Sequence, residues 1–155
     1  GRLYTCTAAM DSAGTWSTNG NGCGYGKTCS KTYPVRGICP EGWHLPSKTE
    51  YETLITTVGG SSTAGKMLKS TSGWISNGNG EDSFGFSALP AGWGRVNVSS
   101  LRGQEAYFLS TAEVYDIGNG DRVYIMKLQY DDVIAELRFG GKNIGFSVRC
   151  LQDSP

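Results

Sequence analysis

Cysteine is the residue type with the widest chemical scope in this sequence, because a thiol can bind a metal ion, act as a nucleophile or form a disulfide. Five cysteines occur beside a single histidine, which excludes a zinc site of two cysteines and two histidines. The paired C-x-x-C spacing of a four-cysteine zinc site is also missing. We therefore predict disulfides and, with them, an oxidising compartment.

Two disulfides fit the positions of the cysteines. Cys23 and Cys29 enclose a short glycine-rich step, and a bond between Cys39 and Cys150 would tie the end of the chain to its first third. A closed loop of about 100 residues stabilises by about 4.7 kcal/mol in the chain-entropy model. Cys6 is left as a buried small residue or an unpaired thiol. The alternative is five buried thiols in a cytosolic protein.

His44 is the one histidine that could act as a general base. That role needs a nucleophile and an orienting acid beside it, and no G-x-S-x-G or similar motif is found in the sequence. We expect a structural role, with the ring nitrogens bonded to backbone groups. Copper or redox chemistry at Cys6 is a minor alternative, and we expect no enzymatic activity.

One acidic segment resembles a calcium loop, because oxygen-bearing side chains alternate with glycine. It has no glutamate at the twelfth position, so it is not an EF-hand. Ca²⁺ is the one cofactor for which the sequence gives a candidate site, and a solvated turn is the alternative. The candidate ligands are Asn77, Asn79, Glu81 and Asp82.

A stretch near the C-terminus combines tyrosines with Arg, Asn and Asp, which is the composition of a recognition surface. Aromatic faces stack on sugar rings, and the polar side chains around them can bond hydroxyl groups. The alternative is an ordinary polar sheet face with half-buried tyrosines. The candidate ligand-binding residues are Tyr115, Asn119, Asp121, Tyr124, Gln129, Asp131, Arg138, Phe139, Lys142 and Asn143.

Local signals predict the elements that position these side chains. Ser47 and Glu50 form a capping box before a helix over residues 48–58, and a second helix runs from after Ser62 to Leu68. In the strand 122–129, Val123 and Ile125 should face one side, and Tyr124, Met126 and Leu128 the other. A strand-like RLYTC opens the chain and runs into a short helical patch, and further strands are expected at 105–115, 133–139 and 144–151. Helices early and antiparallel strands late predict an α+β fold.

Composition and charge exclude several classes of protein. The 23 glycines among 155 residues exclude a long helical bundle. A net charge of zero argues against a non-specific nucleic-acid binder, which needs a basic face. No apolar run is long enough to span a membrane. The chain begins at Gly1 without Met, so an export signal could have been removed.

Five blocks of the sequence, taken in order, resemble the Fibrobacter succinogenes major paralogous domain. The blocks are VRGICPEGWHLPSKTEYETL (35–54), AGKMLKSTSGW (64–74), DSFGFSALPAGW (82–93), AYFLSTAE (106–113) and GFSVRC (145–150). The resemblance implies a C-type-lectin-like fold of the formylglycine-generating-enzyme-like branch. It implies a single domain over residues 1–155 that lacks the family's N-terminal strand segment. It also supports the two disulfides, because Cys39 and Cys150 lie in the family's motifs.

Members of this family are exported or surface-attached proteins of Gram-negative bacteria with suspected roles in adhesion or ligand binding. The same fold occurs in variable proteins of diversity-generating retroelements, whose C-terminal stretch is mutated to form the ligand-binding face. We therefore expect an extracellular or cell-surface module that binds a protein or carbohydrate through its C-terminal strands and loops, and a hypervariable binding face is one form that it could take. Nucleic acid and membrane insertion are not expected.

Two alternatives remain open. The chain could be a structural module of a surface protein without a ligand of its own. It could also be an oxidoreductase related to formylglycine-generating enzymes, which use a reactive cysteine pair near the C-terminal end. A free thiol of low pKa at Cys6 or Cys150 would favour the second alternative.

Overall fold

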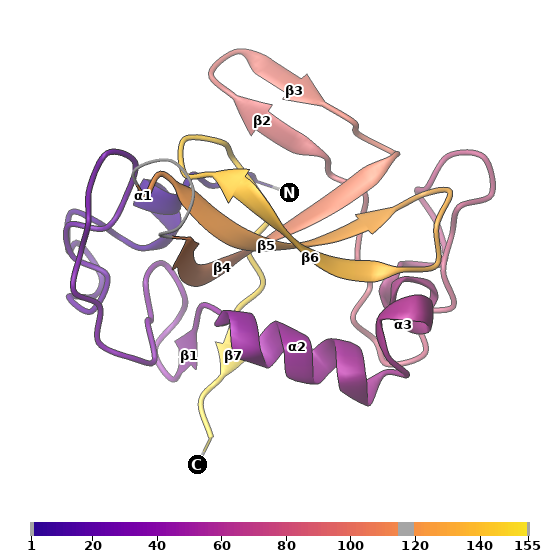
Figure 1. The fold of residues 1–155 in the computed structure, drawn as a ribbon, viewed down its shortest axis with the longest axis horizontal. Coiled ribbons are helices and arrows are strands. Elements are labelled where there is room, and N and C mark those ends of the chain that lie inside the picture. The colour runs from indigo at the N-terminus through magenta and orange to yellow at the C-terminus, as the bar shows by residue number, and fades with distance from the viewer. Residues whose placement is uncertain (1, 115–119, 155) are drawn as a thin grey trace.

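The computed structural model describes residues 2–114 and 120–154 and has an α+β architecture. A three-stranded antiparallel sheet lies at its centre, with two helices on one face and a β-hairpin on the other (Figure 1). The predicted fold class is thereby confirmed. Among the helices of the described ranges, none has the length and apolar character needed to cross a bilayer.

The central sheet has the strand order β4-β5-β6. Its strands are β4 (Glu105–Val114), β5 (Arg122–Gln129) and β6 (Ala135–Gly141), each antiparallel to the next. The pairing of β4 with β5 shifts register between Leu109 and Glu113. The first two strands lie where the sequence predicts them.

Side chains of β5 alternate between two hydrophobic cores, as the sequence predicts. Val123 and Ile125 belong to one core, and Met126 and Leu128 belong to the other. All four are almost fully buried. The central sheet is therefore covered on both faces, and β5 is its middle strand.

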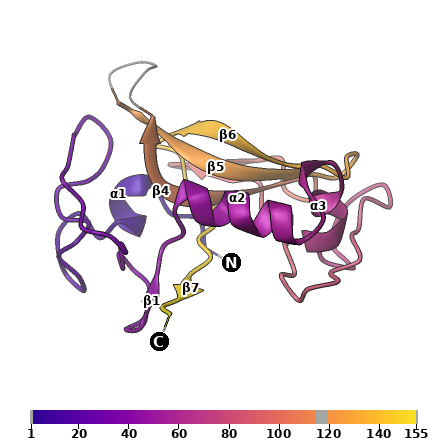
Figure 2. The same cartoon turned by 60° about the horizontal axis from the view of Figure 1, so that its bottom comes forward.

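Two helices cover one face of the sheet (Figures 1 and 2). They are α2 (Lys48–Thr57) and α3 (Ser61–Leu68), which confirms both predicted helices, although α2 ends one residue before its predicted end and α3 begins two residues before its predicted start. The predicted capping box is present: Glu50 N–H donates to Ser47 Oγ, and the Glu50 carboxylate accepts from Ser47 N–H. The residues that these helices and their ends bury against the sheet are Tyr51, Ile55, Val58, Ala64 and Leu68.

The opposite face of the sheet carries a hairpin of β2 (Trp93–Arg95) and β3 (Val98–Ser100). Gly94 and Gly145 anchor the hairpin through two backbone hydrogen bonds of 3.0 and 2.7 Å. A side chain at Gly145 would lie within 3.4 Å of the Gly94 carbonyl, so glycine permits this close approach. The sequence indicates only short apolar runs here, because each strand has just three residues.

The N-terminal segment packs on the same side as the hairpin. Its short helix α1 (Cys6–Ala9) confirms the predicted helical patch, with Thr5 as the N-cap. The strand-like start is reduced to one bridge between Tyr4 and Phe146. The second core combines α1 with distant parts of the chain through Cys6, Met10, Val35, Leu45, Leu109, Ile125 and Phe146.

The predicted strand over residues 144–151 is not a continuous strand. Its residues instead bridge to separate parts of the chain, joining Gly145 to Gly94, Phe146 to Tyr4 and Ser147 to Phe108. Only β7 (Leu151–Gln152) forms a ladder, with β1 (Trp43–His44). The prediction was wrong because alternating apolar and polar residues indicate only which side chains are buried. The pattern does not show whether the backbone hydrogen-bond partners come from one neighbouring strand or from several segments.

The last strand of the sheet, β6, begins at Ala135 and not at Val133 as predicted. Residues of α3, together with Lys69 directly after that helix, hold the turn that precedes β6. Lys66 N–H donates to Val133 O, and the buried Lys69 ammonium donates to the carbonyls of Gln129 and Asp132. These contacts keep Val133 and Ile134 in the turn, where both are exposed.

Both predicted disulfides are present, Cys23–Cys29 and Cys39–Cys150. Cys6 is free and buried, which confirms its interpretation as a small core residue. The second disulfide lies next to the β1–β7 ladder, so it joins the C-terminal segment to residues from the first third of the chain.

Candidate functional site

The candidate recognition surface is divided between the two faces of the central sheet. Tyr124 and Phe139 lie on the α2 side, with ring centroids 5.2 Å apart, and the Lys48 ammonium lies 5.1 Å from the Tyr124 ring. Gln129 and Arg138 lie on the opposite side, because they share the register of Ile125. The candidates that the structure describes therefore do not form one continuous patch.

The other candidates occupy turns. Asp121 accepts a hydrogen bond of 2.6 Å from Gly26 N–H, which fastens the disulfide loop to the start of β5. Asp131 and Asn143 are exposed. Arg138 is exposed and pairs with Glu136 at 2.8 Å. Tyr115 and Asn119 lie outside the described residues.

Lys142 is not available to a ligand, which corrects its place among the candidates. Its side chain is 1% exposed, and its ammonium lies 2.6 Å from Glu113 Oε1. A lysine in a Gly-Gly-Lys-Asn turn has the local pattern of a solvated residue, but a buried carboxylate from β4 holds it inside the fold.

A depression on the hairpin side of the sheet, here called the sheet hollow, has a volume of about 390 Å³. Its floor and walls come from β2, from the central strands and from the segment after β6. Among the described candidates, Phe139 alone is also a lining residue, from the edge strand β6, although its ring packs against Tyr124. Its other lining residues include Trp93, Arg95, Tyr107, Arg122, Ile144 and Phe146.

Two arginines give the sheet hollow a positive charge. Arg95 and Arg122 are exposed, and neither has an ion-pair partner in the described part of the chain. The carboxylate of Glu105, which contacts the lining residue Tyr107, is paired with Lys127 at 3.1 Å. Tyr107 donates to the same carboxylate, and burial together with that hydrogen bond raises the pKa of its hydroxyl. Sequence reasoning missed Arg95, because it lies in a hairpin too short to predict.

The calcium candidates are each engaged in a separate local contact. Asn79 Oδ1 accepts from Trp74 N–H at 3.1 Å, Glu81 pairs with Lys66 at 2.7 Å, and Asp82 accepts from Ser87. Asn77 is exposed. Across residues 2–114 and 120–154, no three His, Cys, Asp or Glu side chains cluster as metal ligands would. These contacts favour the solvated turn over a calcium site.

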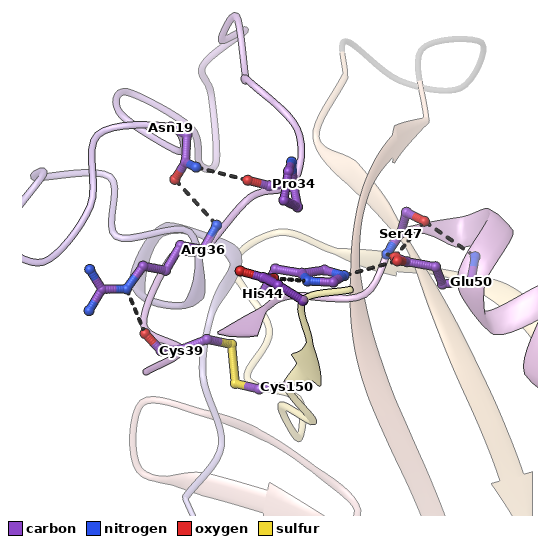
Figure 3. Close-up of polar contacts among 9 residues, drawn as sticks. Asn19, Pro34, Arg36, Cys39, His44, Ser47, Glu50 and Cys150 are labelled. Carbon is purple, nitrogen blue, oxygen red and sulfur yellow. Dashed lines mark hydrogen bonds and ion pairs between the residues drawn. A yellow bond between two sulfur atoms is a disulfide. The ribbon is translucent and has the colours of Figure 1, made fainter. Parts of the chain in front are cut away.

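His44 binds two carboxylates, which corrects the expectation of backbone partners. Its Nδ1 lies 2.5 Å from Asp153 Oδ1 and its Nε2 lies 2.9 Å from Glu50 Oε1 (Figure 3). Burial alone would lower the pKa of the imidazole, but the hydrogen bonds and charges of the two carboxylates raise it above its ordinary value of 6.5. The ring therefore serves as a cationic link between the C-terminal segment and the start of α2.

This link predicts a stability that falls with rising pH. Because the pKa of His44 is raised by folding, its stabilisation is complete below about pH 6.5 and is lost as the pH rises through the raised value. We expect the melting temperature of the wild type to fall from about pH 6 to about pH 8, where histidine titrates. His44→Gln should flatten this fall, measured by thermal unfolding in matched buffers. An unchanged pH profile in the variant would contradict the link.

The thiol chemistry of the oxidoreductase alternative finds no support in the geometry. Cys150 is bonded to Cys39. Burial raises the pKa of the Cys6 thiol to about 11, and the nearby charges of Lys142, Glu113 and Lys31 act on it less strongly. Cys6 is thus almost wholly protonated near neutral pH and a poor nucleophile.

The family model described as the Fibrobacter succinogenes major domain matches residues 1–152. No curated protein and no solved structure matches the chain. The C-type-lectin-like fold and the relation to diversity-generating retroelements therefore stay predictions. Because the matched residues include all the elements of the fold described above, the chain belongs to the Fibrobacter succinogenes major domain family.

Proposed function

We propose that this chain is an extracellular or surface-displayed binding module that recognises an acidic segment of a partner protein through the sheet hollow. The observation that carries the proposal is one depression lined both by aromatic side chains and by Arg95 and Arg122, which have no ion-pair partner among the described residues. Arginine and aromatic residues dominate the binding energy of protein interfaces. The two disulfides are compatible with an extracellular location.

The hairpin beside the sheet hollow favours a protein over a carbohydrate ligand. Val98 shares the face of Arg95 through its register and is 54% exposed, and Val96 at the hairpin tip is 89% exposed. Branched aliphatic side chains gain by burial against other apolar groups and offer nothing to sugar hydroxyls. A carbohydrate ligand for the same surface is the second candidate.

The proposal includes no covalent chemistry. Both nitrogens of His44 are engaged by carboxylates, and the Cys6 thiol is buried with a raised pKa. The remaining alternative is a structural module without a ligand. The hypothesis of a hypervariable face stays open, and Arg122 and Phe139 fall within the stretch that it concerns.

The test is a selection of random peptides displayed on phage against the immobilised domain. We expect enriched peptides to carry Asp or Glu and their affinity to fall as salt is added. In the double variant Arg95→Ala and Arg122→Ala, affinity should fall about tenfold or more, since hydrogen bonds to charged groups contribute about 1.5–3 kcal/mol each. Arg102→Ala removes the same charge from a different depression and should leave affinity unchanged.

Three outcomes would redirect the assignment. Enriched peptides that bind the double variant normally would remove the sheet hollow from the proposal. Binding of neutral glycans that is lost in the double variant would make the ligand a carbohydrate. If neither peptides nor glycans bind, the structural module becomes the better description.

A further inference from the structure

A second cleft, here called the Trp16 cleft, lies on the N-terminal side of the molecule and shares no lining residue with the sheet hollow. Its volume is about 670 Å³, within the range of small-molecule sites. The side chains that matter for its chemistry are Arg2, Thr7, Asp11, Thr15, Trp16 and Arg36.

Trp16 presents a large apolar surface to solvent from a fixed backbone. Trp16 is 62% exposed. The backbone N–H of Trp16 donates to Asp11 Oδ2 at 2.6 Å, and its backbone carbonyl accepts from Arg36 Nη1 at 2.9 Å. The main chain is thus clamped on both sides of an indole that contributes little to either core. A preorganised aromatic surface loses little entropy when a ligand covers it.

Arg36 is held as firmly as the tryptophan. The Arg36 Nε donates to Cys39 O at 3.0 Å, and the Arg36 backbone N–H donates to Asn19 Oδ1 at 3.2 Å (Figure 3). Asn19 is held in turn, because its Nδ2 donates to Pro34 O. Cys39 is itself fixed by its disulfide. The guanidinium therefore has a defined position at the cleft, and within the described ranges its Nη2 has no hydrogen-bond partner.

The cleft is positively charged although it contains a carboxylate. Asp11 is buried, and its two oxygens accept from the N–H groups of Thr15, Trp16 and Ser17 at 2.6–3.0 Å. Burial alone would raise the pKa of Asp11, but these three donors lower it, so the carboxylate is ionised and fully engaged. Arg2 is exposed and has no hydrogen bond or ion pair to any described residue. Two guanidinium groups are left to meet a ligand.

We propose that the Trp16 cleft binds a sugar unit that carries an acidic group. The indole face of Trp16 stacks on the apolar face of the pyranose ring, and Arg36 and Arg2 pair with the carboxylate or sulfate. The hydroxyls of Thr7 and Thr15, both at the cleft, are donors and acceptors for the ring hydroxyls. Planar guanidinium groups bind carboxylates and sulfates through two parallel hydrogen bonds. This site is independent of the proposed protein-binding function.

The test measures binding of oligogalacturonate to the full chain by calorimetry, with its methyl ester as a matched probe that keeps the ring and removes the charge. Dextran sulfate is a second acidic probe, which separates sulfate from carboxylate recognition. We expect an acidic probe to bind and the methyl ester to bind at least tenfold more weakly. Trp16→Ala should lower the affinity about tenfold or more, as loss of a central aromatic contact does. Arg2→Gln should lower it less, without disturbing the fold.

Phe84→Ala is the control variant, since Phe84 is 59% exposed and lies outside the Trp16 cleft. It should bind the acidic probe normally, and so should the double variant of Arg95 and Arg122. Unfolding midpoints close to that of the wild type show that Trp16→Ala is folded. Equal binding of the acid and its methyl ester, normal binding by Trp16→Ala, or no binding of either acidic probe would each overturn the proposal.

Discussion

Replacement of Glu113 by alanine is expected to destabilise the fold by about 3–5 kcal/mol, because it leaves two buried ammonium groups without their shared carboxylate. Lys142 Nζ lies 2.6 Å from Glu113 Oε1, and Lys31 Nζ lies 2.9 Å from Glu113 Oε2. The side chains of Lys142 and Glu113 are 1% exposed, and that of Lys31 is 7% exposed.

The cluster joins three separate parts of the chain. Lys31 follows the small disulfide loop, Glu113 lies near the end of β4, and Lys142 follows β6 directly. Lys142 also donates to Lys27 O at 3.3 Å, a second contact with the loop region. Loss of the carboxylate should therefore detach residues 27–31 from the sheet as well as lower global stability.

Urea denaturation followed by tryptophan fluorescence measures the global effect, and thiol labelling of Cys6 measures the local one. Cys6 lies within the electrostatic influence of all three charges and is the one free thiol. Glu113→Gln retains the shape if the alanine variant fails to fold, and it should still be strongly destabilised. Glu52→Ala breaks a half-exposed pair with Lys48 and should change little. Equal stability of the Glu113 and Glu52 variants would contradict the account.

Local signals predicted the parts of this fold whose physical causes are local. The capping box of Ser47 and Glu50 identified α2, because both partners lie within one turn. The alternation along β5 identified its two buried faces, because the side-chain period of a strand needs no partner to be read. The positions of the cysteines predicted both disulfides, and the motifs of the family supported that pairing.

Polar contacts between side chains and distant parts of the chain were not predicted. The Asp153 partner of His44 lies 109 residues away in sequence, so a backbone acceptor looked equally suitable. Lys142 carries no local sign of burial, because Glu113 and Lys31 reach it from other segments. The Trp16 cleft brings together residues far apart in sequence, such as Arg36, which binds the Trp16 carbonyl from twenty residues further along the chain. The described candidate binding residues therefore lie on both faces of the sheet and in its turns, which the spacing along the chain did not indicate.

Removal of the Cys39–Cys150 disulfide is the second change with a large expected effect. The bond joins residues 111 apart in sequence. In the chain-entropy model the loss of a cross-link over about 100 residues costs about 4.7 kcal/mol. The double variant Cys39→Ala and Cys150→Ala should therefore show a much lower midpoint in urea than the wild type. Alanine is chosen because Cys39 is 1% exposed and a polar replacement would add a desolvation cost.

The small disulfide provides a matched comparison, because its loss also removes two half-cystines and adds no charge. Cys23 and Cys29 are separated by only six residues, so the same model gives about 2.4 kcal/mol. The difference between the two double variants isolates the contribution of loop length. The bond at Cys150 also precedes β7 and Asp153, so its loss should release the C-terminal segment and weaken the pH dependence that His44 imposes. Two results would show that contacts other than this cross-link hold the C-terminal segment in place. One is a larger loss of stability in the variant without Cys23–Cys29 than in the variant without Cys39–Cys150. The other is an unchanged pH dependence of stability in the variant without Cys39–Cys150.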